Sequence, residues 1–332
     1  MNQEKVLLIR MQQSGEVAAI GIPALRYFRQ RLPEASIEML SYAKGIELIR
    51  LAEPDIRVFG LGQQEWPDNI IPAMETFLGL AEKIVAQGYD QIVNLDTGFM
   101  PCFLARFLKD AGEPVVGNFM NITVQELLEQ FQTQQLSPEY VNQPQNYMSS
   151  TFLSMARWHS PWWQGDLLPD NGYPEFYLRS CCGFDDLEME LNIDVPADKA
   201  LKNQSKTKKV IALQCEATEA KLSYPFKTEM EKLLREQGFY VWTVESAQNT
   251  RNQLMQLKAS DLLVTVPGDS QWLASTVSCP SLVICGDVDP RMLMPDYATD
   301  PVTADNPQPI AAAELAESIT SVFEQENDNA DR

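Results

Sequence analysis

Charged and hydroxyl side chains gather in a short stretch near the start of the chain, RMQQSGE. The stretch follows the apolar run Val6–Ile9, which is typical of a buried strand, and precedes a segment whose apolar residues have helical spacing. Ligands of parallel α/β sheets bind beyond the carboxyl ends of the strands. We therefore expect four residues of the stretch to line a site for a polar ligand: Arg10, Ser14, Gly15 and Glu16. Gly15 is predicted to allow a sharp turn of the backbone.

A second polar group follows a later strand in the same way. The segment YDQIVNLDTG predicts a strand over Gln91–Leu95, and Asp96, Thr97 and Gly98 come directly after it. The carboxyl ends of parallel strands lie along one edge of a sheet, so Asp96 is also expected on the ligand side.

The elements that position these residues alternate between strand and helix. In the first part of the chain, strands are predicted at Val6–Ile9, Ser36–Leu40, Ile56–Gly60, Gln91–Leu95 and Val115–Gly117, with helices at Lys44–Leu51, Ile71–Gln87 and Pro101–Lys109. In the second part, strands are predicted at Lys209–Cys215, Phe239–Val244, Leu262–Val266 and Leu282–Cys285, with helices at Pro225–Gln237 and Ala311–Glu324. This alternation predicts an α/β protein made of two Rossmann-like domains that face each other across a cleft.

Changes of composition divide the chain into four parts. Residues 1–184 are expected to form the first domain, with an insertion at 118–184 that is rich in Gln, Asn, Pro and aromatic residues. The polar, charged segment 185–208 is expected to be a linker. The second domain takes 209–300, and 301–332 holds a proline-rich crossing, a terminal helix and an acidic tail.

The insertion contains an aromatic run, ARWHSPWWQGD, in which four ring side chains lie within six positions: Trp158, His159, Trp162 and Trp163. Aromatic faces stack on apolar surfaces of ligands, so the run is a candidate platform for a sugar or lipid acceptor. Aromatic rings also bury a large area. The second interpretation, which we favour, is a loop that packs onto its own domain.

The composition limits the partners and cofactors. The formal charge of −20 opposes broad binding to nucleic acid, which needs a basic face. The sequence lacks an apolar run long enough to span a membrane and the features of a signal peptide, so we expect a cytoplasmic protein with at most peripheral membrane contact. The six cysteines and single histidine have no metal-ligand spacing. We therefore expect free thiols, no metal and no resident cofactor.

Several segments together resemble glycosyltransferase family 9, the ADP-heptose:lipopolysaccharide heptosyltransferases. Near the N-terminus, the family pattern is a basic residue, Gly-Asp-Val, Pro-Ala-Leu and a proline. The matching residues here are Arg10, Gly15, Glu16, Val17, Pro23, Ala24, Leu25 and Pro33. The strand segment YDQIVNLD resembles a second family motif.

The second half of the chain carries two further points of resemblance. Lys221 with Tyr224 and Pro225 is similar to the family's Lys-x-x-Trp-Pro. Trp272–Pro280 followed by LVICGDVDP is similar to its His-Leu-x-x-Ala-x-x-x-Pro and Gly-x-x-x-Pro stretch. The resemblance implies the GT-B fold with the active site between the two domains. It also implies inverting, metal-independent transfer of a sugar from a nucleotide sugar such as ADP-heptose to a lipopolysaccharide, saccharide or lipid-linked acceptor.

The resemblance also assigns roles to residues of this chain. Glu16 stands at the position of the family's proposed base, an aspartate, and would accept the proton of the acceptor hydroxyl. The implied donor contacts are Thr218, Lys221, Asp269, Ser270 and Gly286, and the implied phosphate or acceptor contacts are Arg10, Ser14, Gly15 and Asp96. The alternatives are that Glu16 only stabilises a helix N-terminus and that Lys221 is a solvated surface residue.

The chain departs from the family pattern where the donor is expected. The family's Asp-Ser/Thr-Gly loop corresponds to PGDSQ, Pro267–Gln271, and the histidine after it is Trp272. Side chains thus stand where glycine leaves room for the nucleotide. A second hypothesis is therefore a catalytically silent homologue that acts as a binding or scaffold protein in the assembly of envelope polysaccharide.

Overall fold

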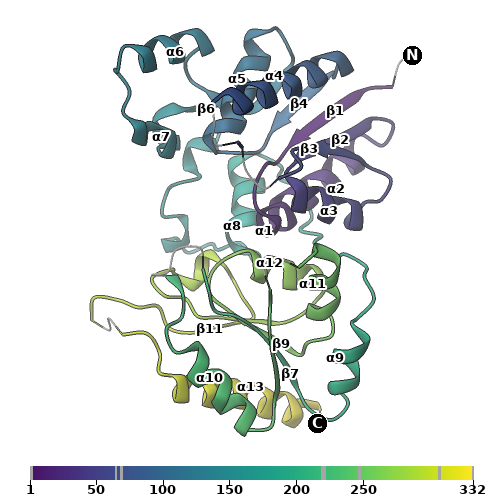
Figure 1. Ribbon diagram of the computed structural model, residues 1–332, viewed down its shortest axis with the longest axis vertical. Helices are drawn as coiled ribbons and strands as arrows, with labels where there is room; N and C mark the ends of the chain where they lie inside the picture. Colours follow the sequence, from purple (N-terminus) through teal and green to yellow (C-terminus); the bar gives the residue numbers. More distant parts are fainter. Residues whose placement is uncertain are drawn as a thin grey trace. The chain divides into compact units, whose positions relative to one another are not determined.

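The apolar run at the start of the chain forms β1 (Lys5–Ile9), an inner strand of a six-stranded sheet in the computed structural model (Figure 1). Val6–Ile9 is fully buried, as expected for a parallel strand with helices on both faces of its sheet. The structure describes residues 3–63, 66–67, 70–217, 222–245, 248–305 and 308–330.

The first sheet has the strand order β3-β2-β1-β4-β5-β6. All neighbouring pairs are parallel except β5 and β6, which are antiparallel. Besides β1, its strands are β2 (Ser36–Ser41), β3 (Arg57–Gly60), β4 (Gln91–Asn94), β5 (Val115–Met120) and β6 (Met148–Ser150). The order of its five parallel strands is that of a Rossmann fold.

The second sheet is entirely parallel and has the order β11-β10-β9-β7-β8. Its strands are β7 (Val210–Gln214), β8 (Tyr240–Thr243), β9 (Leu262–Thr265), β10 (Ser281–Val283) and β11 (Tyr297–Ala298). This order is the other common arrangement of doubly wound sheets.

Helices connect the strands in both parts of the chain. With the first sheet lie α1 (Ser14–Glu16), α2 (Ile22–Arg31), α3 (Ala43–Ala52), α4 (Ile70–Gln87), α5 (Phe99–Asp110), α6 (Val124–Gln132), α7 (Pro144–Tyr147) and α8 (Gly172–Glu175). With the second lie α9 (Lys199–Gln204), α10 (Lys227–Glu236), α11 (Thr250–Leu257), α12 (Asp269–Thr276) and α13 (Ala312–Ala330).

Shorter helical turns complete the elements. Two are π-helical, η1 (Val17–Gly21) and η5 (Phe176–Cys181). The 3₁₀ turns are η2 (Pro138–Asn142), η3 (Met155–Arg157), η4 (Trp162–Gln164) and η7 (Pro290–Met292).

The chain divides into two compact units, residues 1–191 and 192–332. Each unit contains one of the sheets, which confirms the predicted α/β class with two Rossmann-like domains. The segment 185–208, predicted as a linker, contains α9 and the boundary between the units. All six cysteines are buried free thiols, as predicted. Among the described helices, none combines the length and the apolar character needed to cross a bilayer.

The prediction of a sharp turn at Gly15 is wrong. The loop after β1 ends at Gln13, and Gly15 lies buried inside α1, which continues through η1 into α2. Pro23 accounts for the wider π-helical turn that precedes α2. Its ring nitrogen has no hydrogen to donate, and its ring crowds the carbonyl four residues earlier, so the helix opens at this point.

Candidate functional site

Arg10 and Asp96 lie together because of the topology of the first sheet. β1 and β4 are adjacent parallel strands, with Ile9 opposite Asn94. The strand order reverses direction between them, and doubly wound sheets bind ligands at such a point. The residues that follow the two strands therefore lie at one place on the carboxyl edge of the sheet.

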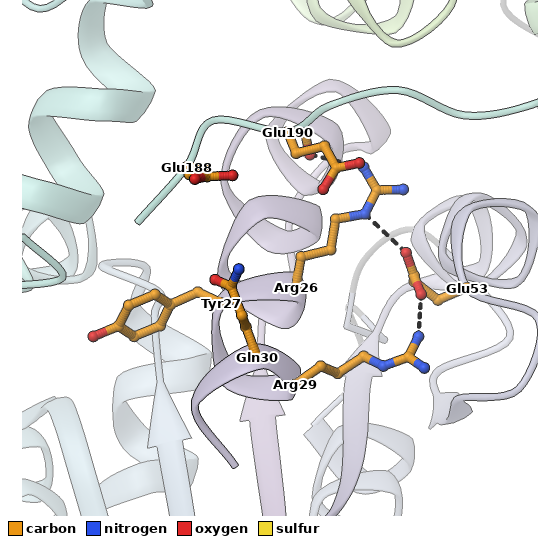
Figure 2. Close-up of a pocket in the computed structure, with 7 residues that line it drawn as sticks. All are labelled: Arg26, Tyr27, Arg29, Gln30, Glu53, Glu188 and Glu190. Atoms are coloured by element: carbon orange, nitrogen blue, oxygen red, sulfur yellow. Dashed lines mark hydrogen bonds and ion pairs between the residues drawn. The ribbon is translucent and has the colours of Figure 1, made fainter. Parts of the chain in front are cut away.

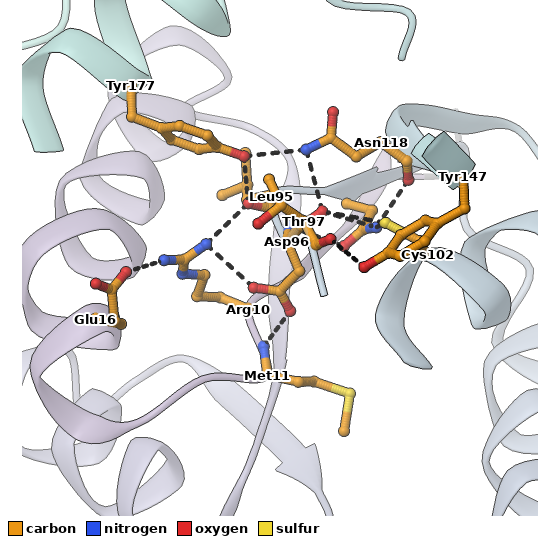
Figure 3. A network of polar contacts seen from close by, with 11 residues as sticks. Arg10, Met11, Glu16, Leu95, Asp96, Thr97, Cys102, Asn118, Tyr147 and Tyr177 are labelled. Carbon is orange, nitrogen blue, oxygen red and sulfur yellow. Dashed lines mark hydrogen bonds and ion pairs between the residues drawn. The ribbon is translucent and has the colours of Figure 1, made fainter. Parts of the chain in front are cut away.

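The Arg10 guanidinium lies at the centre of a buried polar network (Figure 3). Its Nη1 donates to the Leu95 carbonyl oxygen at 2.9 Å and lies 3.1 Å from Asp96 Oδ1. Its Nη2 donates to the Glu16 carboxylate. Burial lowers the pKa of Arg10, but the charges of Asp96 and Glu16 outweigh it and raise the pKa above its ordinary value. Two carboxylates thus balance this buried cation.

Asp96 is the most deeply buried carboxylate of the network, with no exposed surface. Burial raises its pKa to about 6, although the Arg10 charge and the Met11 amide act in the opposite direction. The Met11 amide donates to Asp96 Oδ2 at 2.5 Å. The carboxyl of Asp96 therefore keeps its proton to a higher pH than an exposed aspartate does. Its bond with the Met11 amide links the end of β4 to the loop after β1.

Tyr177 and Asn118 hold the loop that follows β4. The Tyr177 hydroxyl donates to the Leu95 carbonyl at 2.8 Å, so that carbonyl accepts from Tyr177 and Arg10 together. Asn118 Nδ2 donates to the Asp96 carbonyl at 3.1 Å and to the Tyr177 hydroxyl at 3.0 Å. These bonds hold the backbone of Leu95 and Asp96 and so fix the position from which the Asp96 side chain extends.

Close packing of β4 and β5 brings Asn118 into this network. Gly117 lies in the left-handed region with φ of 88°, and a Cβ there would lie 2.3 Å from the Asn94 carbonyl oxygen. A side chain at this position would push the strands apart. Asn94 Nδ2 also joins the two strands, because it donates to the Asn118 carbonyl at 2.7 Å.

Glu16 is the accessible member of the network. Its side chain is 37% exposed, whereas Ser14 and Gly15 before it are buried. Figure 3 shows one carboxylate oxygen directed at Arg10. The other oxygen is available for an incoming hydroxyl, so Glu16 remains a candidate base. The ligand contacts predicted for Arg10, Ser14, Gly15 and Asp96 stay predictions.

The second unit contains a cavity of about 500 Å³ at the carboxyl edge of its sheet. The cavity is lined by Leu222, Ser223, Tyr224, Pro225, Val266, Pro267, Ile284, Cys285, Gly286, Asp287, Val288, Val302 and Pro309. These residues follow β7, β9, β10 and β11, and the strand order reverses between β7 and β9. The position is therefore equivalent to that of Arg10 and Asp96 in the first unit.

The lining of this cavity suits an uncharged ring. Its walls are mostly apolar, and Asp287 is the one charged side chain among the described lining residues. The Tyr224 hydroxyl donates to the Ile310 carbonyl at 2.9 Å and so fixes its ring in the wall. A diphosphate would need cations or backbone amides beside the cavity.

The structure describes three of the five predicted donor residues, and they lie in two places. Gly286 lines the cavity with φ of 57°, a backbone conformation that favours glycine. Asp269 and Ser270 form the first turn of α12, where Ser270 is buried. Thr218 and Lys221 lie outside the described residues. No group of three or more His, Cys, Asp or Glu side chains suited to a metal ion occurs in the described part of the chain.

The aromatic run lies in the first unit and is only partly packed. Trp162 stacks on Phe176, with ring centroids 4.6 Å apart and an interplanar angle of 14°. Trp158 contacts His159, and Trp163 contacts Trp162, both edge to face. The stacked Trp162 supports the packing interpretation for that residue, whereas the acceptor role of the run stays a prediction.

The arginines of α2 are paired with carboxylates. Figure 2 shows Arg26 and Arg29 bound to the two oxygens of Glu53. The residues drawn there line a cavity of about 380 Å³ with three glutamates beside the two arginines. Arg31 pairs with Asp186 at 2.8 Å. Nearby carboxylates thus offset the basic residues of this helix, so they provide little attraction for a phosphate-bearing acceptor.

Sequence reasoning did not identify Tyr177 or Asn118 as part of the site. Tyr177 comes from η5, 82 positions after the Leu95 carbonyl to which it donates. It lies in the segment predicted as an insertion, and no local pattern marks it. Asn118, which follows Gly117 in β5, could have been noticed from the sequence, because a side-chain amide buried in a strand must find hydrogen-bond partners.

No protein-family model and no curated protein matches this sequence. Solved structures match nearly the whole chain. Escherichia coli ADP-heptose LPS heptosyltransferase II is 13% identical, with a TM-score of 0.62 over 97% of this chain and 99% of that one. E. coli heptosyltransferase WaaC with ADP is 13% identical, with a TM-score of 0.58 over 96% and 99%. A Listeria monocytogenes protein assigned as a UDP-N-acetylglucosamine 2-epimerase is 12% identical, with a TM-score of 0.57 over 98% and 89%.

These similarities concern the fold, because identities of 12–13% carry no residue roles between proteins. They confirm the fold that the resemblance in the sequence implies. This chain has the fold of the heptosyltransferases, the GT-B fold with two Rossmann-like domains.

Proposed function

We propose that this protein transfers a sugar from a nucleotide sugar to a saccharide or lipid-linked acceptor. The observation that carries the proposal is the fold, which matches heptosyltransferase structures over almost the whole chain. One of these structures contains ADP, the nucleotide portion of an ADP-sugar. The candidate residues of each unit lie at the carboxyl edge of its sheet, where folds of this kind bind ligands.

In the proposed reaction, Glu16 removes the proton of the acceptor hydroxyl, and the hydroxyl oxygen attacks the anomeric carbon while the nucleoside diphosphate leaves. The transfer would invert the configuration of the sugar and would need no metal. Arg10 holds one oxygen of Glu16, and Asp96 and Leu95 hold Arg10. This buried support would keep the accessible carboxylate in one position, as a catalytic base requires.

The cavity of the second unit is the proposed place for the nucleotide. Its volume of about 500 Å³ and its apolar walls fit a base and part of a ribose. Gly286 borders the cavity, and Asp269 and Ser270 begin α12. Lys221 is the proposed cation for the diphosphate, because the described residues that line the cavity include none.

A catalytically silent homologue that binds other polysaccharide enzymes is the second candidate function. Two observations favour it. Carboxylates of the chain itself already surround Arg10. Among the described residues that line the second cavity, the charged one is Asp287, which would repel a diphosphate.

A panel of nucleotide sugars distinguishes these functions. The full-length protein would be incubated with ADP-, UDP- and GDP-sugars and a mixture of saccharide acceptors, and nucleoside diphosphate and sugar products would be measured. The proposal predicts release of nucleoside diphosphate that depends on both donor and acceptor. Conversion of the sugar without release of nucleotide would indicate an epimerase instead. Absence of both products, together with intact nucleotide binding, would favour the silent homologue.

A further inference from the structure

Two leucines beside the aromatic run lie entirely in solvent. Leu153 is 103% exposed and Leu167 is 95% exposed, whereas the next most exposed large apolar side chain of the described residues, Met74, reaches 58%. Trp158 and Trp163 lie between them in the sequence and are partly exposed. Exposed apolar side chains can mark an interaction site, and these four belong to one short segment of the chain.

The segment that presents these side chains is tied to the body of the first unit. The Thr151 amide donates to the Gly117 carbonyl at 3.0 Å, and the Gly117 amide donates to Thr151 Oγ1 at 2.7 Å. Met155 is buried, and Trp162 stacks on Phe176. Since neighbouring residues anchor the backbone, the fold itself holds Leu153 in solvent.

The same segment differs from the rest of the chain in charge. Asp and Glu make up 46 of the 332 residues, about one in seven, yet residues 140–165 include neither. Arg157 is the one fully charged residue in this stretch. An acidic protein therefore has a stretch that can approach a lipid headgroup region with few carboxylates, and Asp166 beside Leu167 is the first carboxylate after it.

We propose that the segment 151–167 docks on the surface of a lipid bilayer, with Leu153 and Leu167 inserted among the acyl chains. Tryptophan favours the interface between headgroups and acyl chains, which suits Trp158 and Trp163. A bilayer accepts separate protruding side chains, whereas a protein partner requires a continuous surface of matching shape. The protruding leucines therefore fit a bilayer better than a protein.

Vesicle flotation with the full-length protein tests this proposal. The vesicles would contain phosphatidylcholine alone or phosphatidylcholine with about one quarter phosphatidylglycerol. We expect the protein to float with phosphatidylcholine vesicles, and the tryptophan emission to shift to shorter wavelength. Binding should persist in about 0.5 M salt because apolar insertion carries it. Anionic lipid should not strengthen binding, since the protein has a charge of −20.

Paired substitutions provide the matched comparison. L153D/L167D should weaken binding to vesicles by roughly tenfold or more. L78D/L128D makes the same change at leucines that are 46% and 50% exposed on α4 and α6 of the same unit, and it should bind as the unchanged protein does. Thermal unfolding midpoints close to that of the unchanged protein would show that both variants fold.

The proposal is overturned if the unchanged protein floats with neither kind of vesicle, or if the two double variants bind equally well. Binding that requires anionic lipid and disappears in salt would also overturn it, because charge would then carry the contact. The inference is independent of sugar transfer, so the Glu16→Gln variant should still float.

Discussion

The Arg10 guanidinium and the Asp96 carboxylate lie 3.1 Å apart, both buried, where β1 and β4 end side by side. The same guanidinium holds Glu16, which reaches solvent. A buried carboxylate thus supports an arginine, and the arginine orients an accessible carboxylate. This chain of contacts places one candidate base at the carboxyl edge of the first sheet.

Stability should depend on pH through Asp96. Its pKa is about 6 in the folded protein against an ordinary value of 3.8, so the folded state keeps the proton longer than the unfolded chain. The stabilisation from the protonated carboxyl is present below the ordinary value and is lost as the pH rises through about 6. A difference of this size corresponds to about 3 kcal/mol.

Chemical denaturation of the wild type and of Asp96→Asn, at about pH 4 and about pH 7.5, would measure this effect. The free energy of unfolding of the wild type, relative to the variant, should fall by about 2 kcal/mol between the two pH values, because the unfolded carboxyl is already partly charged at about pH 4. The exposed Asp170, changed to Asn, serves as the control and should show no such trend. A wild type that gains stability over the variant as the pH rises would show that the carboxylate is favoured in its charged form.

Glu16→Gln should remove transfer while leaving the donor site intact. The amide keeps the size of the carboxylate but cannot accept a proton, so the rate of transfer should fall by about 100-fold or more. Nucleotide affinity, measured by calorimetry, should change by less than about twofold. Glu82→Gln on α4, an exposed position, is the control for the substitution itself. Turnover that survives in Glu16→Gln would exclude this residue as the base.

Tyr177→Phe should weaken both the fold and the site. The change removes the hydroxyl that donates to the Leu95 carbonyl and accepts from Asn118. Loss of these buried bonds should lower the free energy of unfolding by about 1–3 kcal/mol. Tyr140→Phe, at a ring that packs against Tyr147, should cost less. Equal stability of the two variants would show that the hydroxyl network contributes little.

Val288→Trp should block the cavity of the second unit. Val288 lines the cavity and is partly exposed, so a larger ring can enter without disturbing the core. We expect nucleotide affinity to fall by at least about tenfold, with an unchanged melting temperature. Val85→Trp, on the exposed side of α4, is the matched control. Unchanged nucleotide binding in Val288→Trp would place the nucleotide elsewhere.

The fold was accessible from the sequence because hydrophobic patterns report burial directly. The helix predicted at Ile71–Gln87 is α4, and the strand predicted at Gln91–Leu95 is β4, each displaced at one end by a single residue. The sequence also placed Arg10 and Asp96 at the same carboxyl edge, because parallel strands share that edge. The strand order that puts them side by side was not predicted and comes from the structure.

The contacts within the site were less accessible, because they depend on side chains distant in the sequence. Tyr177 joins the network from 82 positions away, and its own neighbours give no sign of it. The turn predicted at Gly15 failed because the helix begins earlier, at Ser14, and adapts to Pro23 through a π-helical turn. The carboxylates that pair with the arginines of α2, Glu53, Asp55 and Asp186, also lie outside that helix, so its own pattern does not indicate them.

Binding of a nucleotide by the unmodified full-length protein tests the central claim most directly. Isothermal titration with ADP, UDP and GDP would be performed at nucleotide concentrations up to several millimolar. The proposed glycosyltransferase predicts saturable binding of at least one nucleotide, with a dissociation constant between about 1 μM and 1 mM. Absence of binding for all three nucleotides at these concentrations would contradict it.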